Sequence, residues 1–193
     1  MRSRPRFEMM SPMPTETAPK KRSPRRASKA KTAEVARSYF EAVAARDIDA
    51  MASHYAPGGG GPIHGLVDLK VDENYREWFG NLFRAFPDWT FEVLNLIAEG
   101  DKAAVEWRAR ATFNGTARFE GMEPNGAQLD VQGCDVVTVK DGKIQRIDAY
   151  SSGTEIARQL GALPPQGSVA ERGMTAALNL KTRATELVRK RGS

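Results

Sequence analysis

The sequence contains very little cysteine and no long hydrophobic run. Cys134 is the only cysteine among 193 residues, so the chain cannot form a disulfide within itself. A protein without disulfides suits a reducing compartment, and we expect it to be cytoplasmic. No apolar stretch approaches the roughly 18 residues of a transmembrane helix, and the N-terminus lacks the apolar segment of a signal peptide. These absences predict a soluble protein without a membrane span.

Metal-binding and phosphate-binding patterns are also absent. The two histidines, His54 and His64, do not have a recognised ligand spacing, so we expect no metal site. Gly58 to Gly61 form a run of four glycines, but the run lacks the lysine, the spacing and the preceding strand of a phosphate-binding loop. We therefore expect no nucleotide cofactor, and we predict that the glycines form a surface loop or the flexible mouth of a cavity.

The net charge of +5 is unevenly distributed along the chain. Residues 1–31 hold ten Lys or Arg and two Glu, a net charge of +8, and residues 181–193 hold five Lys or Arg and one Glu, a net charge of +4. The remaining residues, 32–180, therefore carry a net charge of −7. A nucleic-acid-binding fold usually has a basic folded surface, so this acidic body argues against one.

The basic N-terminal segment has the composition of a disordered tail. Residues 1–31 are rich in Pro, Ser, Lys and Arg and contain too few aliphatic side chains to offset the entropy of ordering. Its cluster from Lys20 to Arg26 could attract nucleic acid or another polyanion. The alternative is a solubilising tail with no specific partner.

Helical patterns begin after this tail. Tyr39 and Val43 lie at helical spacing in an amphipathic segment that predicts a helix over residues 32–46. Asp47 is the predicted N-cap of a short second helix, 48–55.

The third predicted helix has a dense aromatic face and ends at Pro87. Such a face is usually part of a hydrophobic core, but it can also line a cavity for a flat apolar ligand. The apolar positions step by three, four or one residue along one face: Val71, Tyr75, Trp78, Phe79, Leu82, Phe83 and Phe86.

Long strands are predicted after the aromatic helix. Residues 89–98, 102–113 and 131–150 are the strand segments, and strict alternation around Val105 and Trp107 indicates one buried and one wetter face. Helices followed by a run of antiparallel strands predict an α+β fold. A curved antiparallel sheet that wraps over the aromatic helix would enclose a cone with an apolar interior.

The segment 131–150 predicts a β-hairpin, because Asp141-Gly142 is a preferred type I′ turn. With a two-residue loop, Asp135 would face Asp148 across the hairpin. Two opposed carboxylates repel, which is why we treat the pair as a candidate site. The alternative is a one-residue slip or a bulge, which would place one aspartate in solvent.

A pair of carboxylates in an apolar cone would suit proton transfer. Both cannot ionise easily, so one pKa would rise towards the range in which an acid removes a proton beside a carbonyl. On this hypothesis Asp148 is the catalytic base, Asp135 shares its proton, and Tyr150 stabilises an enolate oxygen. Arg146 lies on the same face and would oppose the rise in pKa.

The C-terminal part predicts two further elements. A short helix ends at Gly161, and Pro164-Pro165 separate it from a final amphipathic helix, where Ser168 and Glu171 have capping-box spacing. We therefore divide the chain into a disordered basic tail (1–31), an α+β domain (32–163) and a linker with a C-terminal helix (164–193).

Several segments of the chain resemble one known family. Phe86-Pro87-Asp88, Asp101 to Trp107 and Asp141 to Ile144 are similar to segments of the SnoaL-like polyketide cyclases. That group belongs to the nuclear transport factor 2-like superfamily, whose fold is also called cystatin-like. The likeness covers residues 32–165 approximately. It implies a cone-shaped sheet packed on N-terminal helices, with the C-terminal helix as an addition.

The resemblance also implies a type of site. In catalytic relatives an acid on the last long strand faces the cavity and moves protons. Asp148 is the only acid on that strand here. The position expected from the resemblance falls one residue along, at Ala149. A small apolar or polycyclic carbonyl ligand, no cofactor and a homodimer are expected by the same analogy. The candidate ligand-binding residues are Trp78, Phe79, Phe83, Tyr39 and Trp107. The competing hypothesis is a non-enzymatic ligand-binding or dimerisation module.

Overall fold

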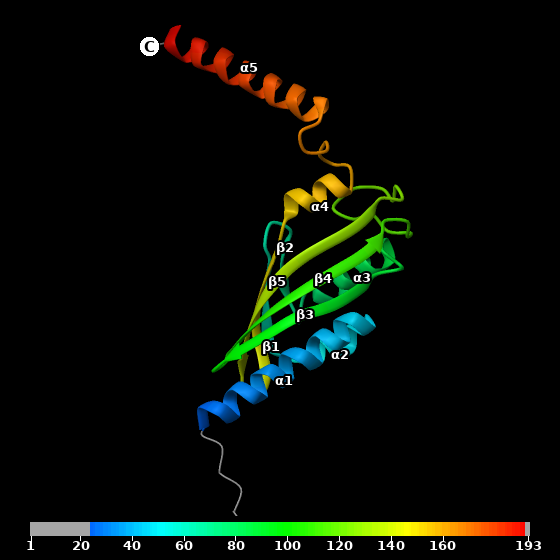
Figure 1. The fold of residues 1–193 in the computed structure, drawn as a ribbon, viewed down its shortest axis with the longest axis vertical. Coiled ribbons are helices and arrows are strands. Elements are labelled where there is room, and N and C mark those ends of the chain that lie inside the picture. The colour runs from blue at the N-terminus through cyan, green and yellow to red at the C-terminus, as the bar shows by residue number, and fades with distance from the viewer. Residues whose placement is uncertain (1–23, 192–193) are drawn as a thin grey trace, which may run out of the picture.

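The computed structural model describes residues 24–191, apart from the side chains of residues 24–29, 187–188 and 190–191. It is an α+β fold, as predicted, and its sheet has six strands (Figure 1). The elements in chain order are α1 (Pro24–Ala45), α2 (Ile48–Ser53), β1 (Tyr55–Ile63), β2 (Val67–Lys70), α3 (Tyr75–Ala85), β3 (Thr90–Glu99), β4 (Lys102–Thr112), β5 (Gln128–Lys140), β6 (Lys143–Ser151), α4 (Gly153–Gln159) and α5 (Val169–Arg191).

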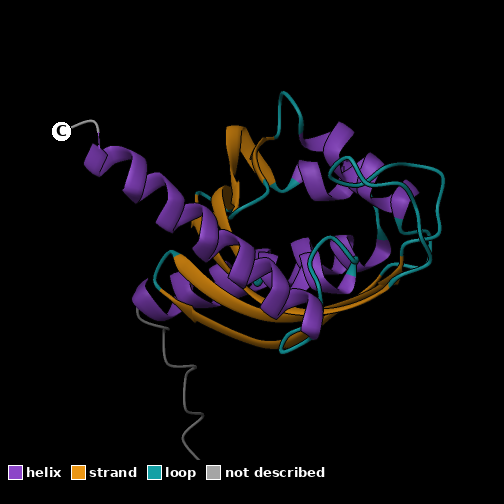
Figure 2. Cartoon of the chain, turned by 90° about the horizontal axis from the view of Figure 1, so that it is seen from above, coloured by secondary structure: helices purple, strands orange, loops and turns teal. Residues whose placement is uncertain are grey.

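The sheet has the strand order β2-β1-β6-β5-β4-β3 and does not close into a barrel. Its strands follow a curve rather than a plane (Figure 2). All neighbours are antiparallel except β1 and β6, which pair in parallel. The predicted curved sheet is therefore confirmed, and the parallel β1–β6 pair is its one departure from an antiparallel arrangement.

The core lies between the inner face of the sheet and the helices. Tyr39 and Phe40 of α1 are almost fully buried, and they share one apolar cluster with Val105, Val137 and Ile144 of the strands. A second cluster surrounds the end of α3. Both clusters reach the same aromatic side chains of α3, so the helix with the predicted aromatic stripe joins the two halves of the core.

The glycine run is part of strand β1, so its prediction as a loop is wrong. Gly60 pairs with Lys70 of β2 and with Arg146 of β6, and therefore lies between two strands. A Cβ on Gly60 would lie 2.0 Å from the carbonyl oxygen of Leu69, and one on Gly61 would lie 2.0 Å from that of Ile147. Glycine is needed here because the neighbouring backbones approach too closely for any side chain.

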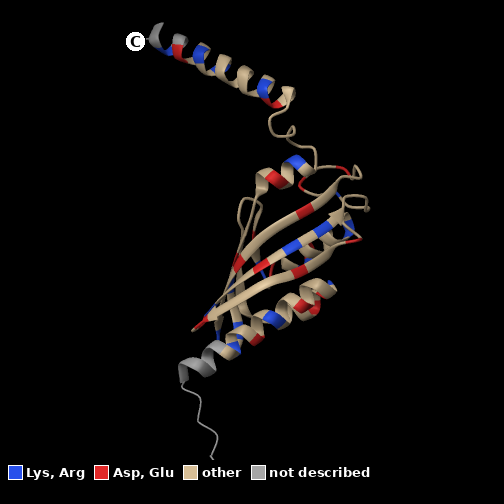
Figure 3. Cartoon of the chain, in the orientation of Figure 1, with Lys and Arg blue, Asp and Glu red and all other residues tan. Residues whose placement is uncertain are grey.

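The ends of the described chain are helical. Helix α1 begins at Pro24, so residues 24–31 of the predicted basic tail are helical in this structure, while the rest of the tail lies outside the described residues. The additional C-terminal helix is present as α5, and it stands apart from the sheet (Figure 1). Basic side chains occur at intervals along it (Figure 3). Within the described range, no helix is long and apolar enough to cross a bilayer.

Replacing Gly60 by alanine should destabilise the protein, because the new methyl group would overlap the backbone of Leu69. We expect the free energy of unfolding, measured by chemical denaturation, to fall by roughly 1–3 kcal/mol. Gly80→Ala is the matched control, because the nearest atom to its added methyl group would be 3.6 Å away. Because alanine is favoured over glycine within a helix, the free energy of unfolding of Gly80→Ala should rise by roughly 0.5–1 kcal/mol instead. Equal effects at the two positions would contradict the close approach of the strands.

Candidate functional site

The β5–β6 hairpin begins with the predicted turn. Asp141 and Gly142 both have positive φ angles, 52° and 76°, as a type I′ turn requires. Lys140 pairs with Lys143, and Val139 pairs with Ile144, as the two-residue loop predicts.

The register then changes, because strand β6 contains one extra residue. Val139 pairs with Ile144 but Thr138 pairs with Arg146, which leaves Gln145 as a bulge. Beyond this bulge, Asp135 faces Ala149, and Val136 faces Asp148. The predicted Asp135–Asp148 pair is therefore wrong, and the alternative that placed one aspartate on the outer face describes the molecule.

Asp148 lies on the outer face and is held in an ion pair. Arg146 donates two hydrogen bonds to its carboxylate, of 2.8 and 2.7 Å, and the Nε2 atom of His64 is 3.6 Å from Oδ1. The guanidinium of Arg146 therefore lowers the pKa of Asp148. Tyr150 is also on this face, 48% exposed, with its ring stacked on His64 at 4.3 Å. The predicted base and enolate-stabilising residue thus lie outside the cavity.

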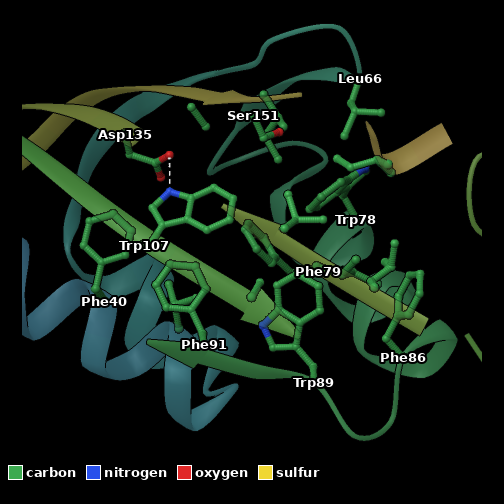
Figure 4. Close-up of a pocket in the computed structure, with 18 of the residues that line it drawn as sticks. Phe40, Leu66, Trp78, Phe79, Phe86, Trp89, Phe91, Trp107, Asp135 and Ser151 are labelled. Carbon is green, nitrogen blue, oxygen red and sulfur yellow. Dashed lines mark hydrogen bonds between the residues drawn. The ribbon is translucent and has the colours of Figure 1, made fainter. Parts of the chain in front are cut away.

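Asp135 points to the inner face, where a cavity of about 120 Å³ lies between the sheet, α1 and α3 (Figure 4). Four of the predicted ligand-binding residues line it: Trp78, Phe79, Tyr39 and Trp107. Phe83 does not line it, and its ring packs 5.9 Å from that of Phe79 and 6.4 Å from that of Trp89. The other lining residues are Phe40, Val43, Ile63, Leu66, Leu82, Phe86, Trp89, Phe91, Ala109, Phe119, Leu129, Val131, Asp135, Ala149, Ser151 and Ile156.

Among the residues that the structure describes, Asp135 is the only carboxylate that lines this largely apolar cavity. It is 7% exposed, and the indole N–H of Trp107 donates a 2.7 Å hydrogen bond to its Oδ1 (Figure 4). Burial raises the pKa of Asp135 to about 7, although the hydrogen bond from Trp107 lowers it. The carboxyl group can therefore both accept and donate a proton near neutral pH.

The indole of Trp107 is positioned by a glycine on the neighbouring strand. Gly133 faces Trp107 across the β4–β5 pair, and a Cβ on Gly133 would lie 2.3 Å from the indole atom Cζ2. The missing side chain leaves room for the ring beside β5, two residues from Asp135. The sequence contains no sign of this contact, because it depends on which strands are neighbours.

A cluster of tyrosine hydroxyls adjoins the acid. The hydroxyls of Tyr39 and Tyr75 are 2.9 Å apart, and the ring of Tyr55 contacts both of the other rings. Burial raises the pKa of all three phenols, and the charge of Asp135 raises that of Tyr55 further. These groups therefore remain protonated near neutral pH, and of the three only Tyr39 lines the cavity.

Other candidate positions do not join the cavity. Cys134 lines a groove on the outer face of the sheet with Ile97 and Tyr150. Burial raises the pKa of its thiol. In residues 24–191, no three His, Cys, Asp or Glu side chains lie close enough together to hold a metal ion.

The family of the chain follows from a comparison with known domains. The model of the SnoaL-like domain matches residues 36–147, which is more than half of the sequence. The chain belongs to the SnoaL-like family. The resemblance to SnoaL-like polyketide cyclases of the nuclear transport factor 2-like superfamily is thereby confirmed. None of the curated protein sequences matches this chain.

Solved structures share the fold at low sequence identity. AclR, a candidate hydroxylase from Streptomyces galilaeus, is 22% identical, covers 81% of this chain and 98% of its own, and has a TM-score of 0.64. A candidate SnoaL-like polyketide cyclase from Jannaschia sp. CCS1 is 23% identical, covers 76% and 100% of the two chains, and has a TM-score of 0.64. An NTF2-like protein from Burkholderia thailandensis E264 is 19% identical, with 67% and 96% covered and a TM-score of 0.58.

The buried carboxyl group should make stability depend on pH. Asp135 has a pKa of about 7 in the folded chain against 3.8 for the free side chain. Between these values the folded state holds a proton that the unfolded state has released, so stability falls as pH rises towards 7. Asp135→Asn removes this slope. We expect its free energy of unfolding relative to the parent protein to increase by roughly 2–4 kcal/mol between pH 4 and pH 8.

Asp148→Asn is the matched control for this pH series. Its pKa is lowered in the fold, so its contribution is present at neutral pH and is lost on acidification. The free energy of unfolding of Asp148→Asn relative to the parent protein should therefore decrease, not increase, as the pH rises from acidic to neutral. A pH dependence of Asp135→Asn identical to that of the parent would contradict the burial of an ionisable Asp135.

Proposed function

We propose that the cavity binds a small apolar ligand with a carbonyl group, and that Asp135 transfers protons to and from that ligand. The observation that carries this proposal is one buried carboxylate, that of Asp135, in a cavity lined mainly by apolar side chains. Burial raises its pKa to about 7. A general acid–base works best when its pKa lies near the working pH. A related structure supports the ligand class, since that protein is a candidate SnoaL-like polyketide cyclase.

The hydrogen bonds of Asp135 leave one of its oxygens available. Oδ1 is held by Trp107, while no described residue donates a hydrogen bond to Oδ2. Oδ2 would accept a proton from the carbon beside the ligand carbonyl, which gives an enolate. In an isomerisation, the same proton returns to another carbon. In a cyclisation, the enolate carbon attacks a second carbonyl of the ligand, and the resulting alkoxide takes the proton from Asp135.

The size of the cavity restricts what can be buried. An engineered protein cavity of about 150 Å³ holds one benzene molecule. The cavity of about 120 Å³ is therefore suited to one ring or a short chain, and a polycyclic ligand would extend beyond it. Ile63 at the end of β1 and Leu66 in the β1–β2 connection line the cavity, and they are the residues that a larger ligand would displace.

We also propose that two copies of the chain associate through the outer face of the sheet. Large apolar side chains are exposed there: Ile97 is 62% exposed and Tyr150 48%. Ile97 and Tyr150 border a groove on this face. Exposed apolar patches of this kind mark protein–protein contacts. This association belongs to the competing hypothesis, in which the chain is a dimerisation or ligand-binding module and its cavity has no catalytic role.

Two further proposals concern properties outside the site. Residues 1–31 carry a net charge of +8, which would allow contact with polyanions. The single cysteine favours a reducing compartment such as the cytoplasm.

Proton transfer can be tested with a small ketone before the natural ligand is known. We expect the protein to accelerate exchange of the α-hydrogens of cyclohexanone with D₂O, with a rate that rises as pH increases through about 7, the pKa of Asp135. Asp135→Asn should lower the rate by roughly 100-fold or more, because the base is removed. NMR or mass spectrometry measures the exchange. Asp148→Asn, which alters the ion pair on the other face, should retain it.

Unchanged exchange in Asp135→Asn would rule out Asp135 as the base. Loss of exchange in both variants would instead indicate a general effect on folding. Binding of cyclohexanone without exchange in the parent protein would favour the non-enzymatic alternative.

Association through the sheet can be tested by placing a charge on the exposed face. Ile97→Asp should shift the protein from dimer to monomer, since it would bury an unpaired carboxylate at the interface. Light scattering after gel filtration measures the mass. Leu180→Asp is the matched control, because Leu180 is 69% exposed on α5, away from the sheet. A dimer that survives Ile97→Asp would exclude this face.

A further inference from the structure

Trp89 has a buried hydrogen-bond donor without an acceptor. Its indole nitrogen Nε1 is covered by neighbouring atoms, and no described group accepts its hydrogen bond. It is the only such side-chain atom in the part of the chain that the structure describes. Trp89 is also one of the residues that line the cavity.

A buried donor without a partner destabilises the protein in which it occurs. Such a group loses its hydrogen bonds to water and gains none in return, which is why most buried polar atoms are paired. Trp107 shows the usual arrangement in the same cavity, since its N–H donates to Asp135. Phenylalanine could fill the apolar role of Trp89 without this penalty, so the unpaired N–H needs another explanation.

The surroundings of Trp89 provide no acceptor. Its ring lies 6.4 Å from that of Phe83 and 6.3 Å from that of Phe86, measured between centroids. Figure 4 shows Trp89 and Asp135 on opposite sides of the lining residues, with Trp107 and Phe91 between them. The carboxyl group of Asp135 and the unpaired donor of Trp89 therefore belong to different parts of the lining, which also includes Tyr39 and Ser151.

We propose that Trp89 is the polar anchor of the ligand, and that its indole N–H donates a hydrogen bond to the ligand's carbonyl oxygen. This inference rests on the proposed function of the same cavity. The ligand would be a neutral ring compound with an acceptor oxygen directed towards Trp89 and an acidic C–H directed towards Asp135. Because neighbouring atoms cover the nitrogen, an adjacent ring must move when the oxygen enters.

The same contact would assist proton transfer. When Asp135 removes a proton beside the carbonyl, negative charge develops on the carbonyl oxygen. A donor directed at that oxygen stabilises the enolate more than the neutral ketone. Trp89 would then select for ligands with an oxygen at this position and would also lower the barrier to their enolisation.

A pair of probes of the same shape tests the assignment. Cyclohexanone and methylenecyclohexane differ in one group, C=O against C=CH₂, so only the ketone can accept a hydrogen bond. Removal from water opposes binding of the ketone in every variant, so the informative quantity is the ratio of the two affinities. In Trp89→Phe the affinity for cyclohexanone divided by that for methylenecyclohexane should fall by about 3- to 10-fold, the contribution of one net hydrogen bond. Trp78→Phe is the matched control, because it removes the same atoms from another wall of the cavity.

NMR of the parent protein supplies a second measurement. It requires no substitution, so it does not depend on whether a variant folds. The chain has three tryptophans, so ¹⁵N labelling gives three indole N–H signals. Cyclohexanone should move the Trp89 signal downfield, as expected for a new hydrogen bond, and methylenecyclohexane should not. The Trp107 signal should move less, because its N–H is already bonded to Asp135.

The outcomes separate the two proposals. An affinity ratio that is unchanged in Trp89→Phe, or that falls equally in Trp78→Phe, would overturn the role of Trp89 while leaving the cavity as a binding site. A Trp89 signal that responds equally to both probes would do the same. Failure of the parent protein to bind either probe would overturn the proposed function itself, and the role of Trp89 with it.

Discussion

One extra residue in strand β6 determines which carboxylate faces the cavity. Gln145 has no partner on β5, and the bulge reverses the direction of every later side chain in β6 relative to a regular hairpin. Asp148 is therefore directed to the outer face, where Arg146 neutralises it. The same shift leaves Asp135 opposite the small side chain of Ala149, so the inner face has one buried carboxylate and no opposing charge. Without the bulge, two aspartates would repel each other across the hairpin.

The position of Asp135 shows a balance between stability and reactivity. A carboxylate in an apolar cavity is unfavourable, and the chain compensates with one hydrogen bond from Trp107 rather than with an ion pair. A buried guanidinium would lower the pKa and would hold the acid permanently ionised. A cavity with no donor at all would raise the pKa further and would hold it protonated. The single neutral donor gives a pKa near 7, between these two cases.

The sequence predicted elements that depend on local pattern and missed those that depend on neighbours. The aromatic stripe of α3, the Asp141-Gly142 turn and the alternation in β4 are local, and each indicated the correct element. The glycine run was mistaken for a loop because its glycines are required by the close approach of two neighbouring strands, β2 and β6. Which strands are neighbours of the run is set by the tertiary fold. The bulge at Gln145 has no distinctive residue, so the hairpin register could not be read beyond Ile144.

The same limit applies to the cavity. Trp78, Phe79, Tyr39 and Trp107 could be named because a dense apolar face or a strict alternation points inwards. Trp89 was not named, because the sequence predicted it only as the first residue of a strand, 89–98, and in the structure it lies in the connection before β3. Its importance comes from an unpaired nitrogen, and hydrogen-bond partners are set by tertiary packing.

Asp135 lies directly across the strand pair from the position at which the resemblance implies an acid. The resemblance to catalytic relatives implies an acid on the last long strand at the position of Ala149, and this chain has no acid there. Asp135 is directly opposite Ala149 on the adjacent strand, and the Cβ atoms of opposed residues lie about 5 Å apart. A carboxylate at residue 135 therefore reaches the region of the cavity that one at residue 149 would occupy. An exchange of position across one strand pair requires a small residue on the other strand, and Ala149 meets that requirement.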